Sequence, residues 1–177
     1  NVSALPGEHR YPRISFTGTA FLVAWNTQTF DNTGFHNRID AQLIQGDGTK
    51  LGPNLPMSPE SIADDSPPSI APVTKGSVVA WVRRSDTKGS DVVLTTVDQV
   101  GQKLAAAGGP CAPDEAGCGI AQVTDSGKTS MPYLGRPLLA ERTASPTEDV
   151  VSVTWLDTRN YPRSGAGCLN LNDVHWK

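Results

Sequence analysis

The sequence lacks several features that mark large classes of protein. No run approaches the ~18 apolar residues that a membrane-spanning helix needs, so we expect no membrane span. The 15 basic side chains form no block and are outnumbered by 18 acidic ones, which argues against a nucleic-acid partner. There is no Gly-x-Ser-x-Gly nucleophile elbow and no Cys-x-x-Cys-His haem-attachment motif. The N-terminal segment has no basic patch followed by an apolar core, so we expect no signal peptide in this form of the chain.

Cysteine is scarce, with three residues in 177, and two of them bracket the short loop CAPDEAGC. We predict a disulfide between Cys111 and Cys118, because a Pro-containing loop holds them within bridging reach. A reduced pair is the alternative. A zinc site is disfavoured because no second Cys or His pair stands at ligand spacing. Cys168 is left unpaired by this count. The disulfide favours an extracellular or cell-surface protein.

An internal repeat is the main positive signal. The segments YPRISFTGTAFLVAWN (residues 11–26) and PPSIAPVTKGSVVAWV (residues 67–82) match after a shift of 56 positions, which aligns Trp25 with Trp81. After a polar loop, RIDAQLIQGDGTKL (residues 38–51) matches DVVLTTVDQVGQKL (residues 91–104) without gaps. Each copy has alternating apolar runs separated by Gly-containing turns, which is typical of antiparallel hairpins. One unit is therefore predicted to contain four strands.

A third copy, GRPLLAERTASPTEDVVSVTWLDTRN (residues 135–160), places Trp155 in the same role. The later NDVHWK places Asp173 and Val174 where the first copy has Arg38 and Ile39. We expect units at residues 11–58, 67–107 and 135–177, with a Cys-bearing insertion at residues 108–134. The chain then stops inside the third strand of its third unit.

Tandem four-stranded antiparallel units of 40–50 residues are typical of β-propellers. We therefore predict an all-β, β-propeller-like fold with about three four-stranded blades. Known propellers carry about four to eight blades, so three form an incomplete ring. We expect another protein chain, or the rest of a longer polypeptide, to complete it.

The amino-acid sequence of the repeats resembles that of a known family. WLDTRN followed by NDVHW, and FLVAWN followed by IDAQLIQGDGTKLG, are similar to the sialidase-like (BNR-type) repeats of secreted and cell-surface bacterial proteins. The strict Asp-box of that family is absent. A sialidase resemblance would imply an arginine triad, a Tyr nucleophile with its Glu, and an acid/base Asp. No motif here matches those residues, so we assign no catalytic residue.

Polar residues after the Trp strands are the candidate ligand site. If the units are equivalent, these loops lie on one face of the disc. Asp and Asn in such loops also cap turns, which is the alternative. Oxygen-rich loops can bind calcium, but no EF-hand spacing supports it, so we expect no metal and no cofactor. We expect the strand Trp residues to pack between blades and Trp176 to face a partner. The candidates are Asp31, Asn32, Asp86, Asp157, Arg159, Asn160 and Trp176.

Three functions fit these observations. The first is a non-catalytic extracellular binding or scaffold module for glycans or proteins. The second is a fragment of a sialidase-like glycoside hydrolase, and the third is a structural subunit of a cell-surface assembly. An exposed aromatic beside polar loop residues would favour glycan binding, and Arg, Tyr and Glu gathered in a central cleft would favour the enzyme. An inter-chain sheet would favour the assembly.

Overall fold

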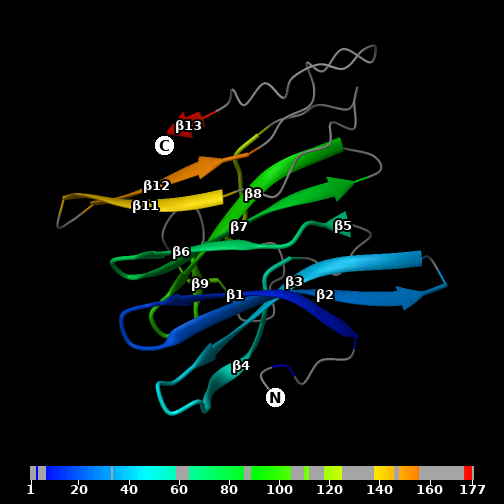
Figure 1. The fold of residues 1–177 in the computed structure, drawn as a ribbon, viewed down its shortest axis with the longest axis horizontal. Helices are drawn as coiled ribbons and strands as arrows, with labels where there is room; N and C mark the ends of the chain where they lie inside the picture. Colours follow the sequence, from blue (N-terminus) through cyan, green and yellow to red (C-terminus); the bar gives the residue numbers. More distant parts are fainter. Residues whose placement is uncertain are drawn as a thin grey trace.

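The computed structural model describes residue 3 and residues 7–32, 34–58, 64–85, 89–104, 110–111, 118–124, 138–145, 148–155 and 174–176. Within these residues every regular element is a β-strand and none is a helix, so the all-β prediction is confirmed. The strands form a ten-stranded sheet and a three-stranded sheet, and neither closes on itself in the described part of the chain (Figure 1).

The first unit is an antiparallel meander of four strands. It contains β1 (Glu8–Phe16), β2 (Phe21–Asp31), β3 (Gly34–Ile44) and β4 (Lys50–Pro56), paired in that order. The turn between β3 and β4 has Gly48 at φ 86°, a left-handed conformation that glycine adopts without steric cost. Four strands and a glycine turn were both predicted for this unit, and both are confirmed.

The second unit repeats the meander with the same cross-strand partners. Its strands are β6 (Ser69–Val73), β7 (Gly76–Ser85), β8 (Gly89–Asp98) and β9 (Lys103–Leu104). Trp25 lies opposite Asp40, and Trp81 lies opposite Val93, as the alignment of the two copies requires. In the same way Ile14 pairs with Val23 and Ile70 pairs with Val79. The repeat seen in the sequence is therefore a repeat of strand register.

Two very short strands complete the edges of the second unit. β5 (Asp64–Asp65) continues the edge of β6 along β7, and β10 (Ala121–Gln122) continues the edge of β9 along β8. In the first unit, β1 and β4 each cover the equivalent stretch as one strand with a bulge. Part of the predicted insertion at residues 108–134 therefore belongs to the outer edge of the second sheet. A parallel bridge from β5 to β3 joins the two units.

A hydroxyl ends the outer strand in both units. The Ile39 amide donates to Ser58 Oγ at 2.9 Å, and the Val92 amide donates to Thr124 Oγ1 at 2.9 Å. The carbonyl of Ile39 accepts from the Met57 amide, and the carbonyl of Val92 accepts from the Val123 amide, each at 2.8 Å. These bonds satisfy backbone groups of the third strand beyond the end of its partner, as buried backbone groups require.

The third unit consists of β11 (Leu138–Ser145), β12 (Glu148–Thr154) and β13 (Val174–Trp176), all antiparallel. Leu139 pairs with Val153, which matches the first strand pair of the other units. The predicted place of Val174 is wrong by two residues. It pairs with Thr154, so it takes the position of Ala41 rather than that of Ile39. A slip of two residues keeps every side chain on its face, so the apolar pattern cannot distinguish the two registers.

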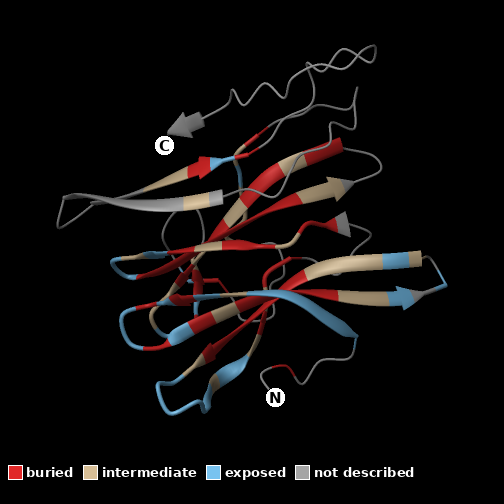
Figure 2. Cartoon of the chain, viewed as in Figure 1, coloured by how far each residue is buried: buried red, intermediate tan, exposed pale blue. Residues whose placement is uncertain are grey.

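Each unit has two different faces, which we name from the residues they carry. The Trp face holds Val23 and Trp25 in the first unit, with equivalents in the others. The aliphatic face holds Leu22 and Ala24 in the first unit and their equivalents. One core joins the aliphatic face of the first unit to the Trp face of the second and includes Trp81, which is fully buried. Buried residues accordingly run along much of β7 and β8 (Figure 2). A second core joins Val82 and Val92 on the aliphatic face of the second unit to the Trp face of the third.

The units therefore stack in one direction, with an aliphatic face always meeting the next Trp face. The first strands of the units also lie together, since β6 contacts both β1 and β11 (Figure 1). The prediction that the strand Trp residues pack between units is confirmed for Trp81 and Trp155. Trp25 is buried, but it lies on the Trp face of the first unit, outside both cores.

Candidate functional site

The predicted ligand residues fall largely outside the described residues. Asp86, Asp157, Arg159 and Asn160 all lie there, and the side chains of Asp31 and Trp176 are also outside the description. The backbone of Trp176 is in β13. Asn32 is exposed in the tight turn that joins β2 to β3. The predicted loop site therefore reduces to the tip of the β2–β3 hairpin.

An aromatic pair occupies this tip. Phe30 and Phe35 lie opposite each other on β2 and β3, with ring centroids 4.7 Å apart and a 52° angle between the rings. Their side chains are 71% and 67% exposed. Two Phe side chains held this far into solvent, next to Asn32, have no role in the core and form a ready contact surface. Sequence reasoning missed the pair, although aromatic residues on both sides of a short turn were a visible signal.

The hairpin that carries the pair is longer than its counterpart. Fifteen positions separate Trp25 from its partner Asp40, and twelve separate Trp81 from its partner Val93. The first unit thus has three more residues beyond its Trp, and β2 and β3 extend past the body of the molecule (Figure 1). Because of the extra length, this tip differs from the tip of the β7–β8 hairpin, and the two Phe rings lie away from the cores.

A polar network covers Trp25 at the base of the same hairpin. Thr27 Oγ1 lies 2.6 Å from Asp40 Oδ2 and accepts a hydrogen bond from Trp25 Nε1 at 2.9 Å. Arg38 Nε donates to the same Asp40 oxygen at 2.9 Å, and Asp40 is 1% exposed. The His9 ring stands edge-on to the indole, with centroids 6.0 Å apart. A buried carboxylate is tolerated here because it is both paired with a cation and hydrogen-bonded.

The hydrogen bonds fix the direction of donation at Thr27. Thr27 has one hydroxyl hydrogen, and it donates this hydrogen to Asp40 Oδ2 because a carboxylate can only accept. His9 Nδ1, 3.3 Å from Thr27 Oγ1, must then donate to that oxygen. The other ring nitrogen, Nε2, lies 3.0 Å from Ser3 Oγ. The chain Ser3–His9–Thr27–Asp40 thus connects Ser3 to the buried carboxylate on the Trp face.

The second unit has a different polar layer at the same positions. Asp65 replaces His9 and Arg83 replaces Thr27, by the register of the first two strands. Arg83 Nε is 3.9 Å from Asp65 Oδ1, and the guanidinium carbon is 5.8 Å from the centroid of the Trp81 ring. Asn26 of the first unit donates to the Asp65 carbonyl at 3.0 Å, so this layer lies between two units. Sequence reasoning missed both layers, because cross-strand neighbours are recognised only when register is known.

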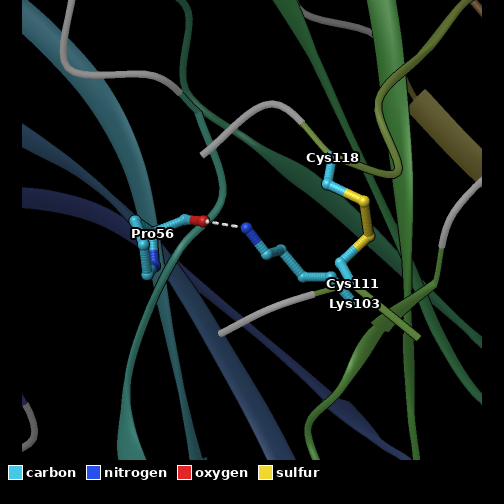
Figure 3. Close-up of a disulfide and its surroundings, with 4 residues drawn as sticks. All are labelled: Pro56, Lys103, Cys111 and Cys118. Carbon is cyan, nitrogen blue, oxygen red and sulfur yellow. Dashed lines mark hydrogen bonds between the residues drawn. A yellow bond between two sulfur atoms is a disulfide. The ribbon is translucent and has the colours of Figure 1, made fainter. Parts of the chain in front are cut away.

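The predicted disulfide between Cys111 and Cys118 is present (Figure 3). The Cys111 amide donates to the Lys103 carbonyl at 2.8 Å, which ties the bridge to β9. Lys103 is 2% exposed, and its Nζ donates to the Pro56 carbonyl at 3.0 Å (Figure 3). Because Pro56 ends β4, this bond connects the outer edges of the first two units. The bridge closes the loop inserted between β9 and β10.

Two exposed acid–base features have displaced pKa values. A hydrogen bond to Glu8, together with its charge, raises the pKa of Arg10. Hydrogen bonds from the Thr49 hydroxyl and amide lower the pKa of Asp47 in the turn after β3. Among the described residues, no three His, Cys, Asp or Glu side chains are placed to hold a metal ion. In the same part of the chain, no helix is long and apolar enough to cross a membrane.

Comparison with known proteins adds no assignment. No family model matches the chain, and no curated protein or solved structure matches it.

Proposed function

We propose that the protein is a β-propeller-like, non-catalytic extracellular module that binds a glycan or protein ligand. Three features support the propeller-like arrangement: the repeated four-stranded register, the one-directional stacking of units, and the adjacent first strands. In a propeller, blades stack face to face around an axis lined by their first strands. The disulfide in the inserted loop supports an oxidising, extracellular environment.

The observation that carries the binding role is the exposed Phe30–Phe35 pair beside Asn32. Aromatic rings provide large apolar contact area, and a neighbouring amide provides directional hydrogen bonds. This combination suits the apolar C–H face of a sugar ring together with its hydroxyl groups. It therefore favours a glycan ligand over a purely structural role for the hairpin.

The test is a glycan array, followed by titration of the best ligand into the wild-type protein and into the Phe30→Ser/Phe35→Ser variant. We expect at least a tenfold loss of affinity, because each ring loses its contact area. Val100→Ser removes an apolar side chain that is 69% exposed on another turn and should leave binding unchanged. Equal binding by all three proteins would place the ligand site elsewhere. An array without hits would favour a protein ligand.

A sialidase-like hydrolase is the second candidate, because β1 carries Glu, Arg and Tyr side chains together. Arg10 Nη2 donates to Glu8 Oε2 at 2.7 Å, and Tyr11 follows with φ 56°, an uncommon conformation for a residue other than glycine. All three side chains are exposed. The test is release of a fluorescent phenol from a sialoside. Turnover that is lost in Tyr11→Phe would favour the enzyme, whereas we expect no turnover.

A further inference from the structure

One end of the Trp face of the first unit, next to the turn between β1 and β2, is exposed where the second unit's Trp face is buried, although Trp25 and Asp40 further along the face are covered. Ile14, Phe16 and Phe21 are 63%, 51% and 37% exposed, and the two Phe rings touch with centroids 5.3 Å apart. Phe21 corresponds to Ser77, which is fully buried, because the aliphatic face of the first unit covers it. The exposed face therefore carries larger apolar side chains than the equivalent covered face.

The stacking within the chain indicates what covers such a face. In both observed cases a Trp face is covered by the aliphatic face of another four-stranded unit. The third unit has an aliphatic face that no described unit covers, and Thr154 on that face is exposed. By register Trp176 takes the position of Leu43, a core residue of the aliphatic face in the first unit. Among the described residues, therefore, part of one Trp face and part of one aliphatic face are exposed on the same chain.

We propose that a second copy of this chain covers the Trp face of the first unit with the aliphatic face of its own third unit. This inference rests on the propeller-like arrangement proposed above. A head-to-tail contact repeated by both copies closes a ring if the rotation per unit allows it. Two copies give six units, within the range known for propellers. The net charge of −3 per chain opposes this association only slightly.

If the two copies meet at this face, mutation of its Phe residues should weaken the dimer. Burying one Phe side chain changes an equilibrium constant roughly ten- to a hundredfold. The Phe16→Ser/Phe21→Ser variant should therefore dissociate at a concentration at least a hundredfold above that of the wild type, measured by light scattering and analytical ultracentrifugation across a dilution series. The Phe30→Ser/Phe35→Ser variant is the matched control. It loses the same number of Phe side chains from the hairpin tip and should keep the wild-type dissociation constant.

Cross-linking with a short bifunctional maleimide, in a Cys168→Ser background, tests which faces of the two copies meet. A mixture of Phe16→Cys and Thr154→Cys proteins should give cross-linked dimers, and neither protein alone should do so. Dimers from Phe16→Cys alone would show that two Trp faces meet, which overturns the head-to-tail contact. A wild-type chain that stays monomeric at high micromolar concentration overturns the proposal, as does a dimer that Phe16→Ser/Phe21→Ser does not weaken while circular dichroism shows it folded. Ligand binding at the hairpin tip is read separately on the same samples, so failure of one proposal is distinguishable from failure of the other.

Discussion

Breaking the disulfide should destabilise the second unit by a predictable amount. Cys111 lies just after the bridge between Leu104 and Pro110, and Cys118 lies just before β10 returns to β8. The disulfide therefore links the point where the chain leaves the outer edge of this sheet to the point where it rejoins that edge. Because Ile120 packs on the first core, loss of the bridge should weaken the attachment of β10 and of that core together.

The magnitude follows from the size of the closed loop. The two cysteines are seven positions apart, and the chain-entropy relation for such a short loop gives roughly 2.4 kcal/mol. A change of 1 kcal/mol moves the melting temperature of a domain of 150–250 residues by about 2–4 °C. The Cys111→Ser/Cys118→Ser variant should therefore melt about 5–10 °C below the wild-type protein.

Calorimetry with and without a phosphine reductant measures the effect. The reductant should lower the melting temperature of the wild type and leave that of the double Ser variant unchanged. Alkylation of the unfolded, unreduced wild type should modify at most one cysteine, Cys168, and all three after reduction. Three modified cysteines before reduction would refute the disulfide. If alkylation shows the disulfide but its removal lowers the melting temperature by less than about 2 °C, the loop does not belong to the cooperative unit.

Three further changes test the packing and the turns. Gly76→Ala should cost at least about 2 kcal/mol in urea unfolding, because φ is 151° and the added Cβ meets the neighbouring backbone, whereas Gly46→Ala meets nothing and should be neutral. Lys103→Met should cost about 1–3 kcal/mol by losing its bond to the end of β4, while Lys50→Met, at the equivalent exposed position, should cost almost nothing. Since the pKa of Asp47 is lowered on folding, the contribution of this carboxylate to the free energy of unfolding should be complete above its unfolded pKa and lost as the pH falls through its folded pKa. In NMR spectra the amides of the turn should titrate in the wild type and not in Asp47→Asn.

The sequence predicted the strand order because two kinds of evidence coincided. Apolar alternation marked the strands, and the shared Trp and Gly positions aligned the two copies, so the pairing of Trp25 with Asp40 and that of Trp81 with Val93 are equivalent in the alignment, although the register itself was not predicted. The edge strands were harder. β5 and β10 contain two residues each, too few for any periodic pattern, and an inserted loop separates β10 from β9. Only the hydroxyls of Ser58 and Thr124 mark the shared end of the strand, and they do so through hydrogen bonds rather than spacing.

The candidate site was less predictable for a related reason. The alignment drew attention to positions that agree between units, and most of the apolar ones are buried, Trp81 in the first core among them. The differences between the units lie where equivalent positions disagree: Thr27 against Arg83, and Phe21 against Ser77. The first pair changes the polar layer over the Trp ring. The second places a large exposed residue in the first unit where the second unit has a small covered one.

The same contrast connects packing to function at the hairpin tip. A unit that stacks against another is constrained on the face that is covered, so it varies more freely in its loops and strand ends. The first unit uses this freedom by adding three residues to its second hairpin and placing Phe30 and Phe35 there. Neither ring touches the cores that hold the units together, so the tip can change its chemistry at almost no cost in stability. Binding and assembly are therefore expected to respond to different mutations, with the tip controlling the first and the uncovered Trp face controlling the second.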